Sequence, residues 1–123
     1  MSKKILLLAE DDFFLRGLMK KKIELSGYTV IEAEDGKIAM EKLKEHKVSL
    51  VLLDLLMPEM DGFEVLEVMS KDANLSKIPI VVLSNFGQKE KIDKALVLGA
   101  KDYIVKAHLT PSEIIEVIKK YLV

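Results

Sequence analysis

Five short apolar runs recur along the chain, at residues 5–9, 28–33, 50–53, 80–83 and 103–105. Several of these runs are continuous, so apolar and polar residues do not alternate within them. A continuous apolar strand is buried on both faces, which is typical of a parallel sheet that helices cover on both sides. We therefore interpret the five runs as the strands of a parallel sheet.

Helical spacing of apolar residues separates the predicted strands. The side chains that this spacing predicts to be buried are Phe14, Leu18 and Ile23, then Ala39 and Leu43, then Phe63, Leu66 and Met69, and finally Ile92, Ala95 and Leu96. Strand and helix alternate five times, with connections long enough for right-handed crossovers. The predicted fold is α/β: a five-stranded doubly wound parallel sheet, in the order 2-1-3-4-5, with five helices.

The clearest helix boundary is that of the last helix. Thr110 is a strong N-cap residue, Pro111 suits the first helical position, and Glu113 completes a capping box. The apolar face that follows consists of Ile114, Ile118 and Leu122. Gly27 and Gly99 are expected to end the first and fourth helices. The last helix is expected to reach residue 123, so no effector domain is expected to follow it.

Length and charge restrict the class of protein. The chain has 123 residues and a formal net charge of −1. We expect a single domain over residues 1–123. The charge balance gives no reason to expect direct binding to nucleic acid or to a membrane, and the lysines at 20–22 are interpreted as a solvated helix face. The first apolar run is too short for a signal peptide or a membrane span, so a cytoplasmic protein is expected.

Polar side chains gather where the predicted strands end. Glu10, Asp11 and Asp12 follow the first strand, and Asp54 follows the third. The other two polar residues at strand ends are Ser84, after the fourth, and Lys106, after the fifth. In an open α/β sheet, ligands bind beyond the carboxyl ends of the strands, where the strand order reverses. With the order 2-1-3-4-5, this point lies between the two strands that end in acids.

Several carboxylates in one pocket repel each other, so the pocket holds either a proton or a cation. Hard oxygen ligands with room for water suit Mg²⁺ or Mn²⁺, and cysteine is absent from the chain. The lysine and the hydroxyl of Ser84 can bind an incoming phosphoryl group, which indicates phosphoryl transfer. The alternative for Asp11 and Asp12 is that either one caps the first helix.

Four segments resemble the receiver family of two-component signalling. They are Ala-Glu-Asp-Asp at 9–12, Leu-Asp-Leu-Leu-Met-Pro-Glu-Met-Asp-Gly at 53–62, Val-Leu-Ser at 82–84 and Asp-Tyr-Ile-Val-Lys at 102–106. The resemblance covers essentially the whole chain. It implies a flavodoxin-like receiver fold and a phosphorylation switch rather than an enzyme acting on other substrates.

The resemblance also implies a role for each matching residue. Asp54 would accept the phosphoryl group from a sensor histidine kinase or a histidine phosphotransfer protein, with Lys106 and Ser84 binding that group. The implied ligands of Mg²⁺ or Mn²⁺ are Glu10, Asp11, Asp54 and the backbone carbonyl of Leu56. Ser84 and Tyr103 would form the switch, which changes partner binding at the face of the fourth helix, fifth strand and fifth helix.

The chain departs from the family pattern at three places. Lys106 precedes Ala107, where the family commonly has a cis proline; a cis bond before alanine costs about 3 kcal/mol, so we expect trans, or a strained cis bond held by its surroundings. Asn85 replaces a small residue. Leu56 and Phe86 place apolar bulk beside the phosphoacceptor, and we hypothesise that they hinder the attacking water and lengthen the phosphoryl lifetime.

Three other functions are consistent with parts of this pattern. A haloacid-dehalogenase-like phosphatase also uses an aspartyl phosphate, but it needs an acid where Leu56 stands. A flavin-binding module of the same architecture needs a phosphate-binding loop after the first strand, where residues 10–13 would repel a phosphate. A scaffold without phosphorylation is the third alternative, and the intact acids, hydroxyl and lysine argue against it.

Overall fold

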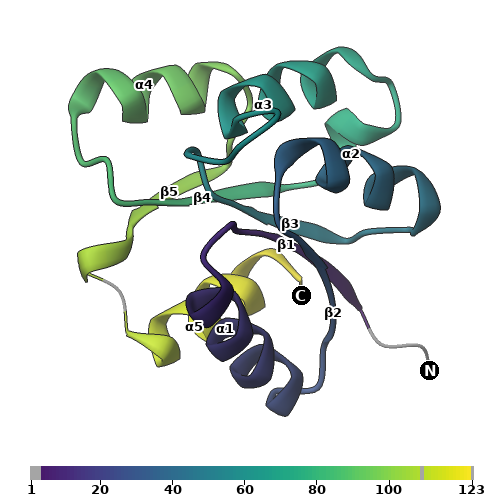
Figure 1. Cartoon of the computed structure of the whole chain (residues 1–123), viewed down its shortest axis with the longest axis vertical. Coiled ribbons are helices and arrows are strands. Elements are labelled where there is room, and N and C mark those ends of the chain that lie inside the picture. Colours follow the sequence, from purple (N-terminus) through teal and green to yellow (C-terminus); the bar gives the residue numbers. More distant parts are fainter. Residues whose placement is uncertain (1–3, 109, 123) are drawn as a thin grey trace.

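The computed structural model describes residues 4–108 and 110–122 and contains one five-stranded parallel sheet (Figure 1). The strands are β1 (Ile5–Ala9), β2 (Thr29–Ala33), β3 (Leu50–Leu53), β4 (Ile80–Ser84) and β5 (Asp102–Val105). Their order in the sheet is β2-β1-β3-β4-β5, and all four neighbouring pairs are parallel. The predicted fold class and strand order are confirmed.

Helices cover both faces of the sheet, which makes three layers. The helices are α1 (Phe13–Leu25), α2 (Gly36–Glu45), α3 (Gly62–Lys71), α4 (Lys89–Val97) and α5 (Pro111–Tyr121). Figure 1 shows α2, α3 and α4 above the sheet and α1 and α5 below it. Two short 3₁₀ turns, η1 (Leu75–Lys77) and η2 (Lys106–His108), lie in the connections. No helix in the described part of the chain is long and apolar enough to cross a membrane.

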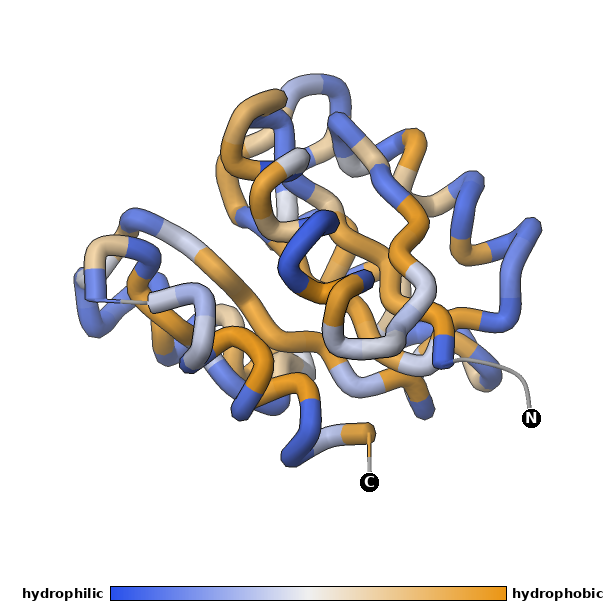
Figure 2. Tube along the Cα trace, turned by 90° about the horizontal axis from the view of Figure 1, so that it is seen from below, coloured by the Kyte–Doolittle hydropathy of each residue, from blue (hydrophilic) through white to orange (hydrophobic). Residues whose placement is uncertain are grey.

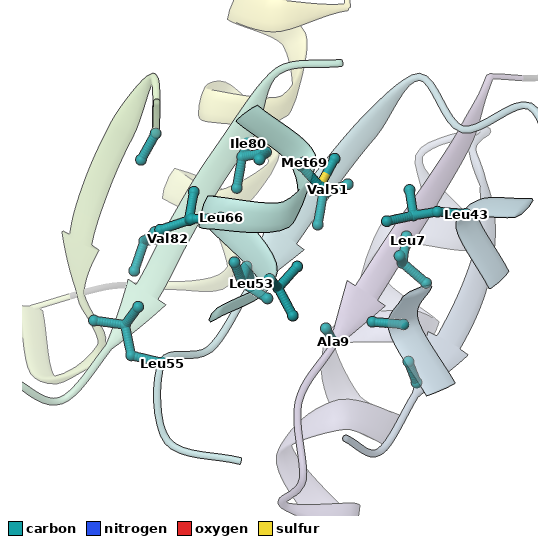
Figure 3. Close-up of a cluster of buried hydrophobic side chains, with 14 of the residues drawn as sticks. Leu7, Ala9, Leu43, Val51, Leu53, Leu55, Leu66, Met69, Ile80 and Val82 are labelled. Atoms are coloured by element: carbon teal, nitrogen blue, oxygen red, sulfur yellow. The ribbon is translucent and has the colours of Figure 1, made fainter. Parts of the chain in front are cut away.

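Two hydrophobic cores lie on the two faces of the sheet, and β1 contributes to both. Leu7 and Ala9 pack with side chains of α2 and α3 on one face (Figure 3). Leu6 and Leu8 pack against α1 and α5 on the other face. Hydrophobic segments accordingly run through the middle of the molecule in Figure 2, and hydrophilic segments lie at its outer turns. The continuous apolar runs of β1, β3 and β4 are therefore buried on both faces, as predicted, whereas the edge strands β2 and β5 are only partly buried.

The buried face of α1 differs from the prediction. Phe14 and Leu18 are 80% and 68% exposed, whereas Ile23 is fully buried as expected. The residues that share the buried face with Ile23 are Arg16 and Met19. The residues at 16, 19 and 23 share one helix face by their spacing, and this face is turned toward the sheet. The charged side chain of Arg16 is thus buried, whereas Phe14 and Leu18, which hydrophobicity alone assigns to the core, are exposed.

The other helices follow the predicted faces more closely. The side chains confirmed as buried are Ala39, Leu43, Leu66, Met69, Ala95, Ile114 and Ile118. Leu96 is 44% exposed, so its predicted burial is wrong. Phe63, Ile92 and Leu122 are half-buried. The last helix ends at residue 121 and not at 123 as expected, with Leu122 as its C-cap. The predicted face of α2 is therefore fully confirmed, and those of α3, α4 and α5 are confirmed in part.

The predicted helix ends are largely confirmed. Gly27 and Gly99 have φ angles of 99° and 115°, which glycine adopts without a steric cost. Thr110 caps α5 by accepting a hydrogen bond from the backbone N–H of Glu113 at 3.3 Å, and Pro111 is the first helical residue. The carboxylate of Glu113 accepts from the Thr110 hydroxyl at 3.1 Å, in place of the backbone N–H that a capping box requires. This part of the prediction is wrong.

Candidate functional site

Four polar side chains meet at the carboxyl ends of the strands, where the sequence predicted a site. Glu10 and Asp54 follow the neighbouring strands β1 and β3, and they are 2% and 7% exposed. Ser84 ends β4 and is 1% exposed, and Lys106 follows β5. All four line one pocket of about 190 Å³, together with Asp11, Asp12, Leu15, Leu56, Asn85 and Phe86. The parallel register of the sheet therefore brings together residues that are up to 96 positions apart.

Lys106 joins the two buried carboxylates. Its Nζ lies 2.8 and 2.9 Å from the two carboxylate oxygens of Glu10 and 3.2 Å from Oδ2 of Asp54. Burial acts to lower the pKa of this lysine, but the hydrogen bond to Glu10 and the charges of both carboxylates outweigh it and raise the pKa. Lys106 therefore stays charged and is shared between the phosphoacceptor candidate and its neighbour.

One lysine does not neutralise the acids around it. Burial, and then the hydrogen bond and charge of Asp54, raise the pKa of Glu10 to about 8, although Lys106 acts in the opposite direction. Carboxylate oxygens of Glu10, Asp11 and Asp54 all lie within 4.8 Å of one another. An excess of hard oxygen donors in one small pocket fits a divalent cation such as Mg²⁺. The donor set is consistent with the predicted ligands.

The two exposed acids after β1 have different surroundings. Asp12 is the N-cap of α1, and its Oδ1 accepts a hydrogen bond from the backbone N–H of Leu15 at 3.0 Å. The helix-capping alternative therefore holds for Asp12. Asp11 is exposed and contributes to the acid cluster, so it is the acid that is available to a cation.

The loop between β3 and α3 packs tightly around Asp54. The backbone N–H of Leu56 is 3.5 Å from Oδ1 of Asp54, and the backbone N–H of Gly62 donates to the carbonyl of Leu55 at 2.9 Å. A Cβ atom at Gly62 would clash with the backbone carbonyl of Asp54. Asp61 and Glu64 form a complete capping box at the start of α3. Hydrogen bonds therefore hold the loop at both ends. The role of the Leu56 carbonyl as a metal ligand stays a prediction.

A chain of hydrogen bonds links the pocket hydroxyl to the half-buried Tyr103. The Oγ of Ser84 accepts from the backbone N–H of Phe86 at 3.0 Å. The backbone carbonyl of Phe86 in turn accepts from the hydroxyl of Tyr103 at 2.6 Å. Sequence reasoning missed this link, because both Phe86 contacts use the backbone and leave no mark on residue type. The proton of the Ser84 hydroxyl remains available to an acceptor in the pocket.

Sequence reasoning assigned no role to Arg16, which is 9% exposed and contacts the segment that carries the acids. Its Nη1 donates to the backbone carbonyl of Glu10 at 2.8 Å, and its Nε pairs with Glu32 at 3.1 Å. The available signal was the spacing of Arg16 with Met19 and Ile23 on one helix face. A charge in such a position indicates a buried partner.

Comparison with known proteins identifies the family. The model of the response regulator receiver domain matches residues 6–119. The chain belongs to this family. The receiver is 40% identical to the chemotaxis protein CheY of Thermotoga maritima over 119 residues, which are 95% of this chain and 96% of that protein. It is 39% identical to CheY of Bacillus subtilis, with the same coverage.

Solved structures agree with this assignment. A CheY-like receiver domain protein from Methanospirillum hungatei superposes with a TM-score of 0.89 at 28% identity, over 97% of this chain and 93% of that one. CheY4 of Vibrio cholerae superposes with a TM-score of 0.90 over 98% and 99% of the two chains. At 23% identity, the latter likeness shows the fold alone.

The departures of this receiver from the family pattern surround the same pocket. The bond between Lys106 and Ala107 is trans, as expected, and both residues belong to the η2 turn. Asn85 is exposed at the pocket, and Phe86 is half-buried beside it. The side chain of Leu56 is 65% exposed at the pocket mouth. The pocket of the phosphoacceptor candidate is therefore lined by three apolar side chains, Leu15, Leu56 and Phe86, and by one amide, Asn85.

Proposed function

We propose that this receiver is a phosphorylation-activated switch in which Asp54 accepts a phosphoryl group in a Mg²⁺-dependent reaction. The observation that carries the proposal is the position of the Asp54 carboxylate, which is 7% exposed in a pocket that also holds Lys106, Ser84 and three further acids. The donor is a phosphohistidine of a sensor histidine kinase or of a histidine phosphotransfer protein. The receiver is a cytoplasmic signalling domain that catalyses only its own phosphorylation and dephosphorylation.

The pocket residues divide the chemistry among them. An oxygen of Asp54 attacks the phosphorus, an O–P bond forms, and the P–N bond to the donor imidazole breaks, leaving an acyl phosphate. Lys106 shifts from Glu10 toward the new phosphoryl oxygens, since it already lies 3.2 Å from Oδ2 of Asp54. The hydroxyl of Ser84 donates its free proton to another phosphoryl oxygen.

A divalent cation fits beside these groups. The carboxylates of Glu10, Asp11 and Asp54 would hold it, together with the backbone carbonyl of Leu56. When bound, the cation supplies positive charge that stabilises the phosphoryl oxygens during transfer. It also relieves the repulsion among the three acids, which lie within 4.8 Å of one another.

The switch begins at Ser84. Movement of its hydroxyl toward the phosphoryl group lengthens the hydrogen bond that Oγ accepts from the amide of Phe86, now 3.0 Å. The backbone carbonyl of Phe86 accepts a hydrogen bond of 2.6 Å from the Tyr103 hydroxyl, so a movement of Phe86 changes the surroundings of β5 directly. We infer that phosphorylation shifts the population of loop and Tyr103 conformers and thereby alters the face formed by α4, β5 and α5.

The exposed apolar residues of α1 suit docking of the phosphodonor. Phe13, Phe14 and Leu18 are 74%, 80% and 68% exposed, and the helix starts directly after the acids of the pocket. An apolar groove of about 400 Å³ between α1 and α5 shares Leu15 and Lys106 with the acid pocket. Exposed apolar patches of this kind mark sites of protein association. A partner bound here would hold its phosphohistidine at the pocket mouth.

Phosphorylation with a small donor tests the proposal. The wild type is incubated with Mg²⁺ and acetyl phosphate or phosphoramidate, and intact mass reports the phosphoryl adduct. We expect an adduct in the wild type, none in Asp54→Ala, and none when a chelator removes Mg²⁺. Asp12→Asn is the matched control, because it changes a neighbouring acid but keeps an N-cap side chain. No adduct on the wild type, or an undiminished adduct in Asp54→Ala, would overturn the proposal.

A further inference from the structure

Arg16 is a buried charge close to the acid pocket, yet it touches neither Asp54 nor the acid side chains of the pocket in the described structure. Its side chain is 11% exposed on the inner face of α1. A buried guanidinium is costly unless its donors are satisfied, so the contacts that hold it are informative. Both contacts lead to neighbouring strands: Nη1 to the carbonyl of Glu10 after β1, and Nε to the carboxylate of Glu32 on β2.

Glu32 holds the guanidinium from the far side. Its second oxygen accepts from Nζ of Lys20 at 3.2 Å, so the carboxylate bridges two cations of α1. Partial burial acts to raise the pKa of Glu32, but the hydrogen bonds from Lys20 and Arg16 lower it below its ordinary value. Glu32 therefore stays ionised and keeps the direction of the Arg16 side chain.

The contact with Glu10 restrains the backbone that carries the acids. The N–H of Glu10 donates to the carbonyl of Ala33 at 3.0 Å, and its own carbonyl accepts from Arg16 at 2.8 Å. The N–H of Glu10 belongs to the preceding peptide, whereas its carbonyl belongs to the peptide that joins Glu10 to Asp11, so Arg16 holds that second peptide through its carbonyl. Within residues 4–108 and 110–122, no hydrogen bond holds the Asp11 carboxylate itself. The direction of Asp11 therefore depends on this peptide.

We propose that Arg16 is a positioning residue for the cation site: through the Glu10 carbonyl, it orients the peptide that presents Asp11, with Glu32 as its anchor. The inference rests on the proposed function, because it assumes that the acids bind a divalent cation. Partners that orient metal ligands commonly contribute tenfold or more to metal affinity. Arg16 acts here through backbone geometry, without touching the cation.

Charge and positioning predict opposite effects, which makes the inference testable. A positive charge near the acids repels a cation, so loss of the Arg16 charge alone would strengthen cation binding. Loss of positioning weakens binding instead, because Asp11 is no longer aimed at the cluster. Arg16→Met removes both charge and hydrogen bonds, whereas Arg16→Lys keeps the charge but cannot reproduce the two-sided guanidinium contact.

Lys20→Met is the matched control. It removes a positive charge from the same network and leaves Arg16 bonded to both Glu10 and Glu32. Affinity for Mn²⁺ is measured on the full chain by electron paramagnetic resonance, and folding is checked by circular dichroism. We expect Arg16→Met to lose about tenfold in Mn²⁺ affinity. Arg16→Lys loses a smaller factor, and Lys20→Met stays within about twofold of the wild type.

A second measurement uses the metal-free protein. ¹⁵N relaxation of the Asp11 amide reports motion of the positioned peptide, and we expect greater mobility in Arg16→Lys but not in Lys20→Met. If Arg16→Met does not fold, the Mn²⁺ affinity and the Asp11 amide relaxation of Arg16→Lys test the inference by themselves. Unchanged or tighter Mn²⁺ binding in the Arg16 variants would overturn the inference. A wild type that binds no Mn²⁺ would instead overturn the metal part of the proposed function, so the two failures are distinct.

Discussion

The hydroxyl of Tyr103 donates a hydrogen bond of 2.6 Å to the backbone carbonyl of Phe86, and the N–H of Phe86 donates to Ser84 at 3.0 Å. An aromatic side chain of β5 is thus tied to the loop that follows the pocket hydroxyl. The tie passes through the backbone of one residue, so any movement of Ser84 alters the surroundings of Tyr103. This relationship gives the proposed switch a physical route out of the pocket.

Tyr103→Phe removes the donor and leaves the ring. We expect a loss of about 1 kcal/mol in the free energy of unfolding and faster hydrogen exchange at the amides of the loop after β4, because the Phe86 carbonyl loses its partner. Tyr121→Phe is the control, since its hydroxyl makes only longer contacts of 3.3 Å. Equal effects of the two substitutions in chemical denaturation and hydrogen exchange would contradict a stabilising role of the hydrogen bond between Tyr103 and Phe86.

Cation affinity is expected to depend on pH through Glu10. Its pKa is raised from 4.5 to about 8, so in the metal-free protein this carboxyl holds a proton at neutral pH. A cation must displace that proton, so the affinity for Mg²⁺ rises with pH and levels off above about pH 8. Calorimetric titration in buffers of different ionisation enthalpy measures the proton released. Binding without proton release at pH 7 would contradict this assignment.

The same group affects stability in the absence of metal. Between pH 4.5 and about 8, the folded state holds a proton on Glu10 that the unfolded chain has lost. The unfolded state therefore binds fewer protons in this window, and the free energy of unfolding falls as pH rises through it. Glu10→Gln cannot titrate, so its stability should fall less over the same window. Denaturant unfolding of both proteins at several pH values makes the comparison.

Leu56 and Phe86 are expected to slow hydrolysis of the acyl phosphate, because their apolar side chains line the pocket where water must approach Asp54. Leu56→Asn should shorten the phosphoryl lifetime, which is followed as the decay of the intact-mass adduct after the small donor is removed. Val97→Asn on α4, where Val97 is 86% exposed and outside the pocket lining, controls for added surface polarity. An unchanged decay rate in Leu56→Asn would refute the role of apolar bulk.

Docking through α1 is tested by separating protein donors from small donors. Phe14→Glu places a charge on an exposed apolar side chain of α1. We expect much slower transfer from any phosphorylated histidine protein that serves the wild type, because the substitution desolvates a carboxylate at the interface. Labelling by acetyl phosphate needs no docking and should be unaffected. A parallel loss of both reactions would indicate damage to the pocket rather than to docking.

Two glycines in helices predict opposite changes in stability. A Cβ atom at Gly36, the first residue of α2, would clash with the backbone of Met60 in the loop that carries the pocket. Gly36→Ala should therefore destabilise the fold by about 1–3 kcal/mol. A Cβ atom at Gly17 of α1 meets nothing within 4 Å, so Gly17→Ala should stabilise by about 0.5–1 kcal/mol. Thermal unfolding distinguishes the two substitutions. Destabilisation by Gly17→Ala would contradict the conclusion that a Cβ atom fits at this position.

The sequence by itself determined the strands, their parallel arrangement and the polar residues at their ends. Continuous apolar runs predict burial on both faces, and parallel strands end at one edge, so Glu10, Asp54, Ser84 and Lys106 could be placed together without coordinates. Gly27 and the N-cap Thr110 were equally predictable, because their effects are local to the backbone.

Only the tertiary structure decided which neighbours these side chains have. Hydrophobicity placed Phe14 and Leu18 in the core, but Arg16 lies inward instead. Its partners there are the backbone carbonyl of Glu10 and the half-buried carboxylate of Glu32, which follow or belong to two other elements of the fold. The sequence likewise assigned Lys106 to the phosphoryl group, whereas its shortest contacts are to Glu10. Buried charges are satisfied by whichever partners the fold brings near, and local patterns carry no information about them.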